Sequence, residues 1–160
     1  LGLLSCRPDI CRREGLRLAN DNLAELTTVA ICDLNGLKEV NDTIGHLAGD
    51  TLIMNFANIL RTSIPQQHFV GRYGGDEFIA ILTGVGEEEA KKILLDVRKE
   101  TGHYNSYSKQ LHLEYAYGYA VSDAYSECCN MKILLEQADR NMYKCKAEMK
   151  EHHKNSHGEI

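Results

Sequence analysis

The sequence predicts an α+β domain in which helices pack against one antiparallel sheet. Three observations lead to this prediction. Short runs rich in β-branched and aromatic residues occur between longer runs with helical periodicity. A Gly-Gly pair separates two of the short runs, which predicts a β-hairpin and therefore antiparallel pairing. The order of the segments from Thr28 onward is β-α-β-β-α-β-α.

The strands are predicted from local composition. Residues 28–32 form an apolar run typical of a buried strand. Residues 68–73 and 78–82 follow, and the glycines between them predict a tight turn with positive φ. Residues 111–121 alternate enough to indicate the last strand.

The helices are predicted from apolar spacing. Residues 49–62 carry apolar side chains three and four positions apart, and Pro65 then ends the helix. A second helix begins with three glutamates at residue 87 and runs to about residue 102. The third runs from 131 to about 150. A β-α-β-β-α-β core is the ferredoxin-like arrangement, an antiparallel sheet backed by helices.

Length and charge limit the functional classes. The chain has 160 residues, enough for one domain with a substantial core, and its formal net charge of −5 excludes an extended basic surface for nucleic acid. No apolar run approaches the ~18 residues of a membrane span, so no membrane contact is expected. The six cysteines lack paired C-x-x-C spacing and predict reduced thiols in a cytoplasmic protein.

Two adjacent carboxylates, Asp76 and Glu77, follow the Gly-Gly pair directly. Like charges this close repel each other, and a bound divalent cation commonly relieves the repulsion. A solvated acidic hairpin is the alternative interpretation.

A second polar cluster follows the first predicted strand. Asp33 lies where that strand ends, and carboxylates at such ends commonly form ligand sites in α/β folds. Asn41 and Asp50 lie near the two ends of a glycine-punctuated loop, and together they suit the hydrogen-bonding edge of a purine. Each residue also fits a local role: Asn41 and Asp42 as turn or capping residues, and Asp50 as the N-cap of the next helix.

Residues 33–50 and 72–78, in this order and spacing, resemble the two signature blocks of the GGDEF family of diguanylate cyclases. The resemblance covers roughly residues 23–150, leaving 1–22 weakly assigned and 151–160 as a polar tail. It implies a palm-like domain, as in nucleotidyl cyclases, that condenses two GTP into cyclic di-GMP for bacterial second-messenger signalling. It also implies a homodimer, because two GTP-loaded sites must meet, and a sensor domain fused to this one.

The resemblance also implies the metal-binding and catalytic residues. Asp33 matches the metal carboxylate of the first block, and the carbonyl of Leu34 matches the backbone ligand beside it. Asp76 matches the acid that binds metal and helps to deprotonate the attacking 3′-hydroxyl, and Glu77 is a further ligand. Two Mg²⁺ or Mn²⁺ ions per active site would contact the attacking and leaving oxygens.

The substrate residues are implied in the same way. Lys38 matches a catalytic lysine associated with the triphosphate, while Asn41 and Asp50 match the residues that bind guanine. His46 belongs to the same substrate-binding block. Lys146 ends a segment that resembles the family's tyrosine-x-alanine-lysine motif and would meet a phosphate.

Three departures from the family pattern stand out. Lys150 stands where the family often has arginine, which keeps the charge but loses the bidentate fork. Asn35 replaces the second aspartate of the first block. The usual opening motif is not recognisable near residue 4. The altered opening motif leaves a catalytically silent GTP-binding regulatory domain as the main alternative, and another nucleotidyl cyclase or dinucleotide synthase is the third.

Overall fold

The computed structural model describes residues 26–122 and 131–156, and the weakly assigned segment 1–22 lies outside them. The strands are β1 (Thr27–Leu34), β2 (Phe69–Arg72), β3 (Glu77–Thr83) and β4 (Tyr115–Val121). The helices are α2 (Leu37–Thr43), α3 (His46–Ser63), α4 (Glu87–Tyr107) and α5 (Met131–Ser156).

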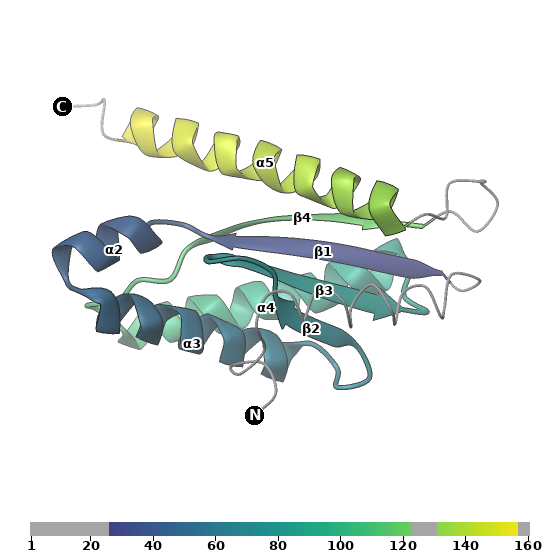
Figure 1. Cartoon of the computed structure of the whole chain (residues 1–160), viewed down its shortest axis with the longest axis horizontal. Helices are drawn as coiled ribbons and strands as arrows, with labels where there is room; N and C mark the ends of the chain where they lie inside the picture. The colour runs from purple at the N-terminus through teal and green to yellow at the C-terminus, as the bar shows by residue number, and fades with distance from the viewer. Residues whose placement is uncertain (1–25, 123–130, 157–160) are drawn as a thin grey trace.

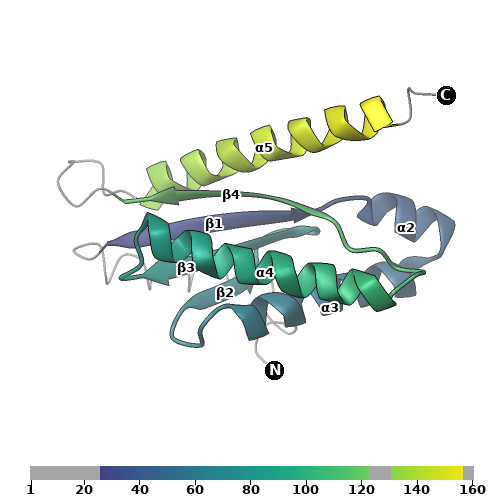
Figure 2. The ribbon, with the colours of Figure 1, turned by 180° about the vertical axis from the view of Figure 1, so that it is seen from behind.

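The four strands form one sheet in the order β2-β3-β1-β4, and every neighbouring pair is antiparallel. Helices α3 and α4 cover one face of the sheet, and α5 lies across the other (Figures 1 and 2). The predicted α+β class and its β-α-β-β-α-β core are confirmed. The helix α5 forms a third layer.

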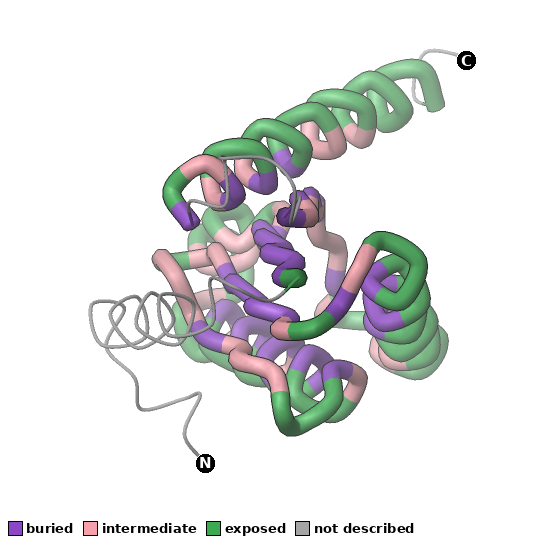
Figure 3. Tube along the Cα trace, turned by 90° about the vertical axis from the view of Figure 1, so that its right-hand side faces the viewer, coloured by how far each residue is buried: buried purple, intermediate pink, exposed green. Residues whose placement is uncertain are grey.

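Two apolar cores result from the alternation of side chains along the strands. On β1, Ala30 and Cys32 face the core beneath α3 and α4, whereas Val29 and Ile31 face α5. Every residue of β1 is buried, as expected for a central strand covered on both faces (Figure 3). The larger core is centred on Phe56, whose ring lies edge-on to Phe78 with centroids 5.2 Å apart.

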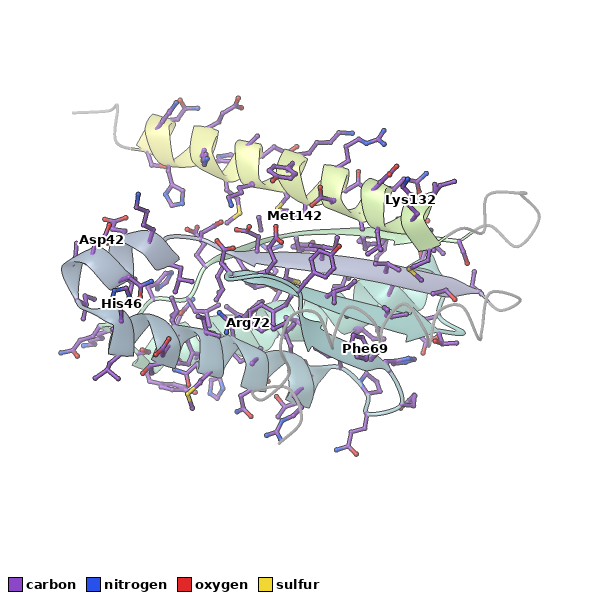
Figure 4. All side chains as sticks on the ribbon, in the orientation of Figure 1. Asp42, His46, Phe69, Arg72, Lys132 and Met142 are labelled. Atoms are coloured by element: carbon purple, nitrogen blue, oxygen red, sulfur yellow. The ribbon has the colours of Figure 1, made fainter. Side chains whose placement is uncertain are left out.

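Gly118 of β4 lets α5 approach the sheet closely. A Cβ built at this position would overlap the backbone of α5 at Met142 and Ala138. Met142 and Ala138 are fully buried in the core beneath α5, and Figure 4 shows Met142 on the side of the helix that faces the sheet. The close approach packs α5 against β4 and the neighbouring strand β1.

The region between β1 and α3 differs from the prediction. Residues 37–43 form the helix α2, and α3 begins at His46, whereas a loop was predicted up to about residue 49. Neither helix begins with a side-chain capping signal, because the N-cap residues are Gly36 and Gly45, which have no side chain to accept a hydrogen bond. The helix α2 also has no fully buried residue to mark a periodic face.

Three further boundaries differ from the prediction. The helix α4 passes through Gly102 to Tyr107, beyond the predicted end. The strand β4 begins at Tyr115 rather than at 111, because the side-chain amide of Asn105 hydrogen-bonds both backbone groups of Leu113 at 2.8 Å. The helix α5 continues to Ser156, so residues 151–156 of the expected polar tail are helical and exposed.

No helix in the two described ranges has the length and apolar character needed to cross a membrane. Cys32 and Cys145 are free thiols, as predicted. The other four cysteines, Cys6, Cys11, Cys128 and Cys129, lie outside the described residues.

We expect Gly118→Ala to lower the free energy of unfolding by about 1–3 kcal/mol or more, because the new methyl group overlaps the α5 backbone. Gly102→Ala is the matched control. It adds a methyl group that meets no atom within 4 Å in the middle of α4, and should stabilise the protein by about 0.5–1 kcal/mol. Urea denaturation of both variants measures the difference, and equal shifts would contradict the packing role of Gly118.

Candidate active site

The pairing of β1 with β3 places Asp33 directly opposite Glu77. Both side chains lie on the α5 face of the sheet, since they follow the alternation of Ile31 and Ile79. The backbone N–H of Leu34 donates a hydrogen bond to the carbonyl of Asp76 at 2.9 Å. The ends of two segments more than 40 residues apart in sequence are therefore held together, as Figure 1 shows beside the start of α2.

The predicted hairpin between β2 and β3 is confirmed, but the predicted positive φ at its glycines is wrong. The positive φ angles among the described residues belong to Gly36, Gly45 and Gly84. The loop spans four residues between the strands, and a loop of this length does not require a primed two-residue turn. Gly74 instead provides space, because a Cβ there would lie 3.0 Å from Oε2 of Glu77.

Arg72 holds the hairpin turn from inside. Its Nη2 donates to the carbonyl of Gly75 at 2.6 Å, and its Nε donates to the carbonyls of Gly74 and Gly75 at 3.1 and 3.2 Å. The amides of Tyr73 and Gly74 both donate to the carbonyl of Glu77. These bonds fix the backbone from which Asp76 and Glu77 project.

The helix α5 adds a cation to the acids. Nζ of Lys146 lies 2.6 Å from Oδ1 of Asp33, and the Asp33 side chain is only 7% exposed. Burial alone would lower the pKa of Lys146, but its hydrogen bond with Asp33 and the charges of Asp33 and Asp76 raise it overall. The ammonium group is therefore held in its charged form.

A further carboxylate, Asp139, lies on α5 two turns before Lys146. Burial raises the pKa of Glu77, and the negative charges of Asp33, Asp76 and Asp139 raise it further, while Lys146 opposes them. Four acids thus share this region with one ammonium group. We refer to Asp33, Asp76, Glu77, Asp139 and Lys146 as the acidic cluster.

The donor groups of the acidic cluster suit a hard divalent cation. Mg²⁺ prefers oxygen ligands and is usually held by one or two carboxylates together with water and substrate phosphates. Asp33 and the hairpin acids are ligands of this kind. Within the described parts of the chain, no three His, Cys, Asp or Glu side chains converge into a complete cage.

The predicted guanine-binding residues lie on α2 and α3. Asn41 belongs to α2 and Asp50 to α3, so Asp50 is not the N-cap of that helix; Gly45 is. The side-chain oxygen of Asn41 lies over Gly49, where a Cβ would clash with it. This contact brings Asn41 beside the residue that precedes Asp50.

Four predicted site residues are exposed: Lys38, His46, Asp50 and Lys150. Figure 4 shows His46 at the corner where α2 meets α3, near Asp42. Lys38 lies on α2, and Lys150 lies one turn beyond Lys146 on α5. No hydrogen bond or ion pair within the described ranges joins Lys38, His46, Asp50 or Lys150 to the acidic cluster.

Sequence reasoning missed two contributors. Asp139 lies seven positions before Lys146, a spacing that places two side chains on one helix face. Arg72 directly precedes the hairpin turn, where a guanidinium can reach turn carbonyls. By contrast, the side-chain amide of Asn35 contacts the Met149 sulfur on α5 at 3.6 Å.

The chain is similar to known proteins of one family. The family model described as "Diguanylate cyclase, GGDEF domain" matches residues 13–152. The probable diguanylate cyclase DgcI of Escherichia coli is 34% identical over 143 residues, which are 86% of this chain and 30% of DgcI. Diguanylate cyclase DgcZ of the same organism is 31% identical over 116 residues, or 72% of this chain and 39% of DgcZ.

A solved structure has the same fold. The GGDEF domain of DgcB from Caulobacter crescentus, solved in complex with c-di-GMP, superposes with a TM-score of 0.75. The two sequences are 22% identical, and the match covers 88% of this chain and 84% of that chain. The curated relatives are longer, since this chain spans less than half the length of DgcI or DgcZ.

Glu77→Gln is expected to stabilise the protein at pH 7 in EDTA. The raised pKa of Glu77 means that the folded state favours the protonated acid, so the wild-type protein loses stability as pH rises through that pKa. The gain should stay below about 1 kcal/mol, because the side chain is partly solvated. It should vanish below the ordinary glutamate pKa of 4.5.

Urea titrations at pH 4 and pH 7 measure this difference. Glu100→Gln, at an exposed acid of α4, is the control and should show little change at either pH. An equal effect of Glu77→Gln at both pH values would contradict the electrostatic role of the neighbouring acids.

Proposed function

Because this chain belongs to the GGDEF family of diguanylate cyclases, we propose that it condenses two molecules of GTP into cyclic di-GMP and releases two pyrophosphates. The observation that supports this most strongly is the register of β1 against β3. It aligns Asp33 with Glu77 and ties Leu34 to Asp76, so both signature blocks contribute to one group of acids.

The acids would hold Mg²⁺ or Mn²⁺, two ions per active site. Asp33, the carbonyl of Leu34, Asp76 and Glu77 are the proposed ligands. When bound, such ions stabilise negative charge on the attacking and leaving oxygens of an in-line phosphoryl transfer. Asp76 would take part in removing the proton from the attacking 3′-hydroxyl, with Glu77 beside it.

The nucleotide would lie between the acidic cluster and the α2–α3 corner. Asn41 and Asp50 would bind the guanine edge, because a carboxylate accepts from its N–H donors and an amide can donate and accept. His46 belongs to the same corner. The basic residues would contact the phosphates: Lys38 from α2, and Lys146 and Lys150 from α5.

Catalysis would require two copies of the chain. The described residues of one chain contain a single set of proposed active-site residues. The reaction, however, joins two GTP molecules. We propose a homodimer in which two loaded sites meet, acting in the cytoplasm within a longer protein that carries a sensor domain. The shorter span of this chain relative to DgcI and DgcZ supports a longer protein.

Incubation with GTP and Mg²⁺, followed by mass analysis of the products, tests the proposal. Cyclic di-GMP and pyrophosphate are expected. Binding of GTP without turnover would instead identify a silent regulatory domain. A product from another nucleotide in a competition series would identify a different cyclase.

Asp76→Ala is expected to abolish formation of cyclic di-GMP while the protein remains folded. Loss of a metal ligand removes charge stabilisation worth several kcal/mol in the transition state, which corresponds to roughly a thousandfold or greater loss of rate. The control is Asp96→Ala, at an exposed acid of α4 whose contact is the i,i+3 ion pair with Lys99. Near-normal turnover by Asp76→Ala would refute the metal assignment.

Asp50→Ala should weaken the binding of GTP far more than that of ATP. An unpaired guanine N–H edge forfeits roughly 1–3 kcal/mol, which is about 5- to 150-fold in affinity. Calorimetry with non-hydrolysable analogues of the two nucleotides gives both affinities. Equal losses would indicate that Asp50 acts on the conformation of α3 and not on the base.

A further inference from the structure

Lys146 contacts an oxygen that a metal would also need. Its Nζ lies 2.6 Å from Oδ1 of Asp33, a short charge-assisted contact between α5 and the end of β1. The Lys146 side chain is 26% exposed and that of Asp33 is 7% exposed. The pair is therefore better shielded from solvent than a surface ion pair, and it should be stronger than one.

The other members of the acidic cluster are acids, and the ammonium group of Lys146 is the cation that contacts Asp33. Asp33 comes from β1, Asp76 and Glu77 from the hairpin, and Asp139 from α5. Tyr143 and Lys146 of α5 are further titratable groups in this region. Among these described groups, Lys146 supplies the positive charge.

A divalent ion and the ammonium group cannot both contact Oδ1 of Asp33 without strong repulsion. Mg²⁺ binds a carboxylate oxygen at about 2.0–2.1 Å, so both cations on the same oxygen would lie only about 3–4 Å apart. Their repulsion in a partly buried site would be strong. A metal ion on Oδ1 would therefore displace the ammonium group from that oxygen.

We propose that Lys146 competes with the divalent cation for Asp33, so that α5 sets the affinity of the site for metal. This inference rests on the proposed function, because it assigns Asp33 to the metal. The lysine side chain is long and partly exposed, which allows the displaced ammonium to turn toward a bound triphosphate. Metal bound alone leaves Lys146 without its carboxylate, whereas metal bound with nucleotide gives it a phosphate.

Mn²⁺ binding without nucleotide tests the competition directly. Lys146→Met keeps an unbranched apolar stem but removes the charge, and should tighten Mn²⁺ binding by about tenfold or more, as expected for removal of one nearby unit charge. Lys144→Met is the matched control, because it removes the same charge from an exposed position of the same helix. Its affinity should stay within about twofold of the wild-type value.

Free Mn²⁺ measured by electron paramagnetic resonance gives the dissociation constants of the three proteins. An equal or weaker affinity in Lys146→Met overturns the proposal, and so does equal tightening in Lys144→Met. Failure of all three proteins to bind Mn²⁺ overturns it as well. Product analysis with GTP is a separate readout, so cyclic di-GMP formation with unchanged Mn²⁺ affinities would refute the competition and leave the proposed function standing.

The folding of Lys146→Met is checked separately. Circular dichroism and thermal unfolding of Lys146→Met establish that the variant is folded, and Lys146→Gln replaces it if it is not.

In the wild-type protein, Mg²⁺ should increase amide hydrogen exchange near Lys146 in α5, because the contact between Lys146 and Asp33 is released. Unchanged exchange at saturating Mg²⁺ would contradict the displacement.

Discussion

The register of β1 against β3 is the constraint on which the site depends. Side chains alternate with a period of two, so a slip of one residue would turn Asp33 toward the core beneath α3 and α4. The apolar residues on both faces of β1 oppose such a slip, since each would have to exchange cores. The hydrogen bond from Leu34 to Asp76 fixes the same alignment at the end of the strand.

The packing of α5 converts this alignment into a charged site. Gly118 permits the helix backbone to lie directly against β4, with Met142 buried beneath it. One turn farther along, the same helix face presents Lys146 to Asp33. A larger residue at 118 would lift the helix away, so a glycine in one strand controls a contact at the end of another.

The acidic cluster is a local electrostatic conflict within an otherwise consistent fold. Asp33 is nearly inaccessible and Glu77 is partly buried among like charges, an arrangement that burial and repulsion both disfavour. Lys146 relieves part of the conflict from α5. Natural proteins keep such conflicts mainly where a ligand resolves them, which agrees with a site for cations and phosphates.

The sequence by itself determined the order of strands and helices along the chain, the long helices and the identity of most candidate residues. Apolar periodicity and the Gly-Gly hairpin are local signals, and the positions of Asp33 and Asp76 within two motifs can be read directly from the linear sequence. The tertiary structure alone decided that Asp139 and Arg72 belong to the site, that Asn35 turns toward Met149, and that Lys146 pairs with Asp33. It also decided the helix α2 and the start of β4 at Tyr115, because a contact such as that of Asn105 with Leu113 leaves no periodic trace. These features depend on distances between segments far apart along the chain, which are set by how two helical layers pack on one sheet.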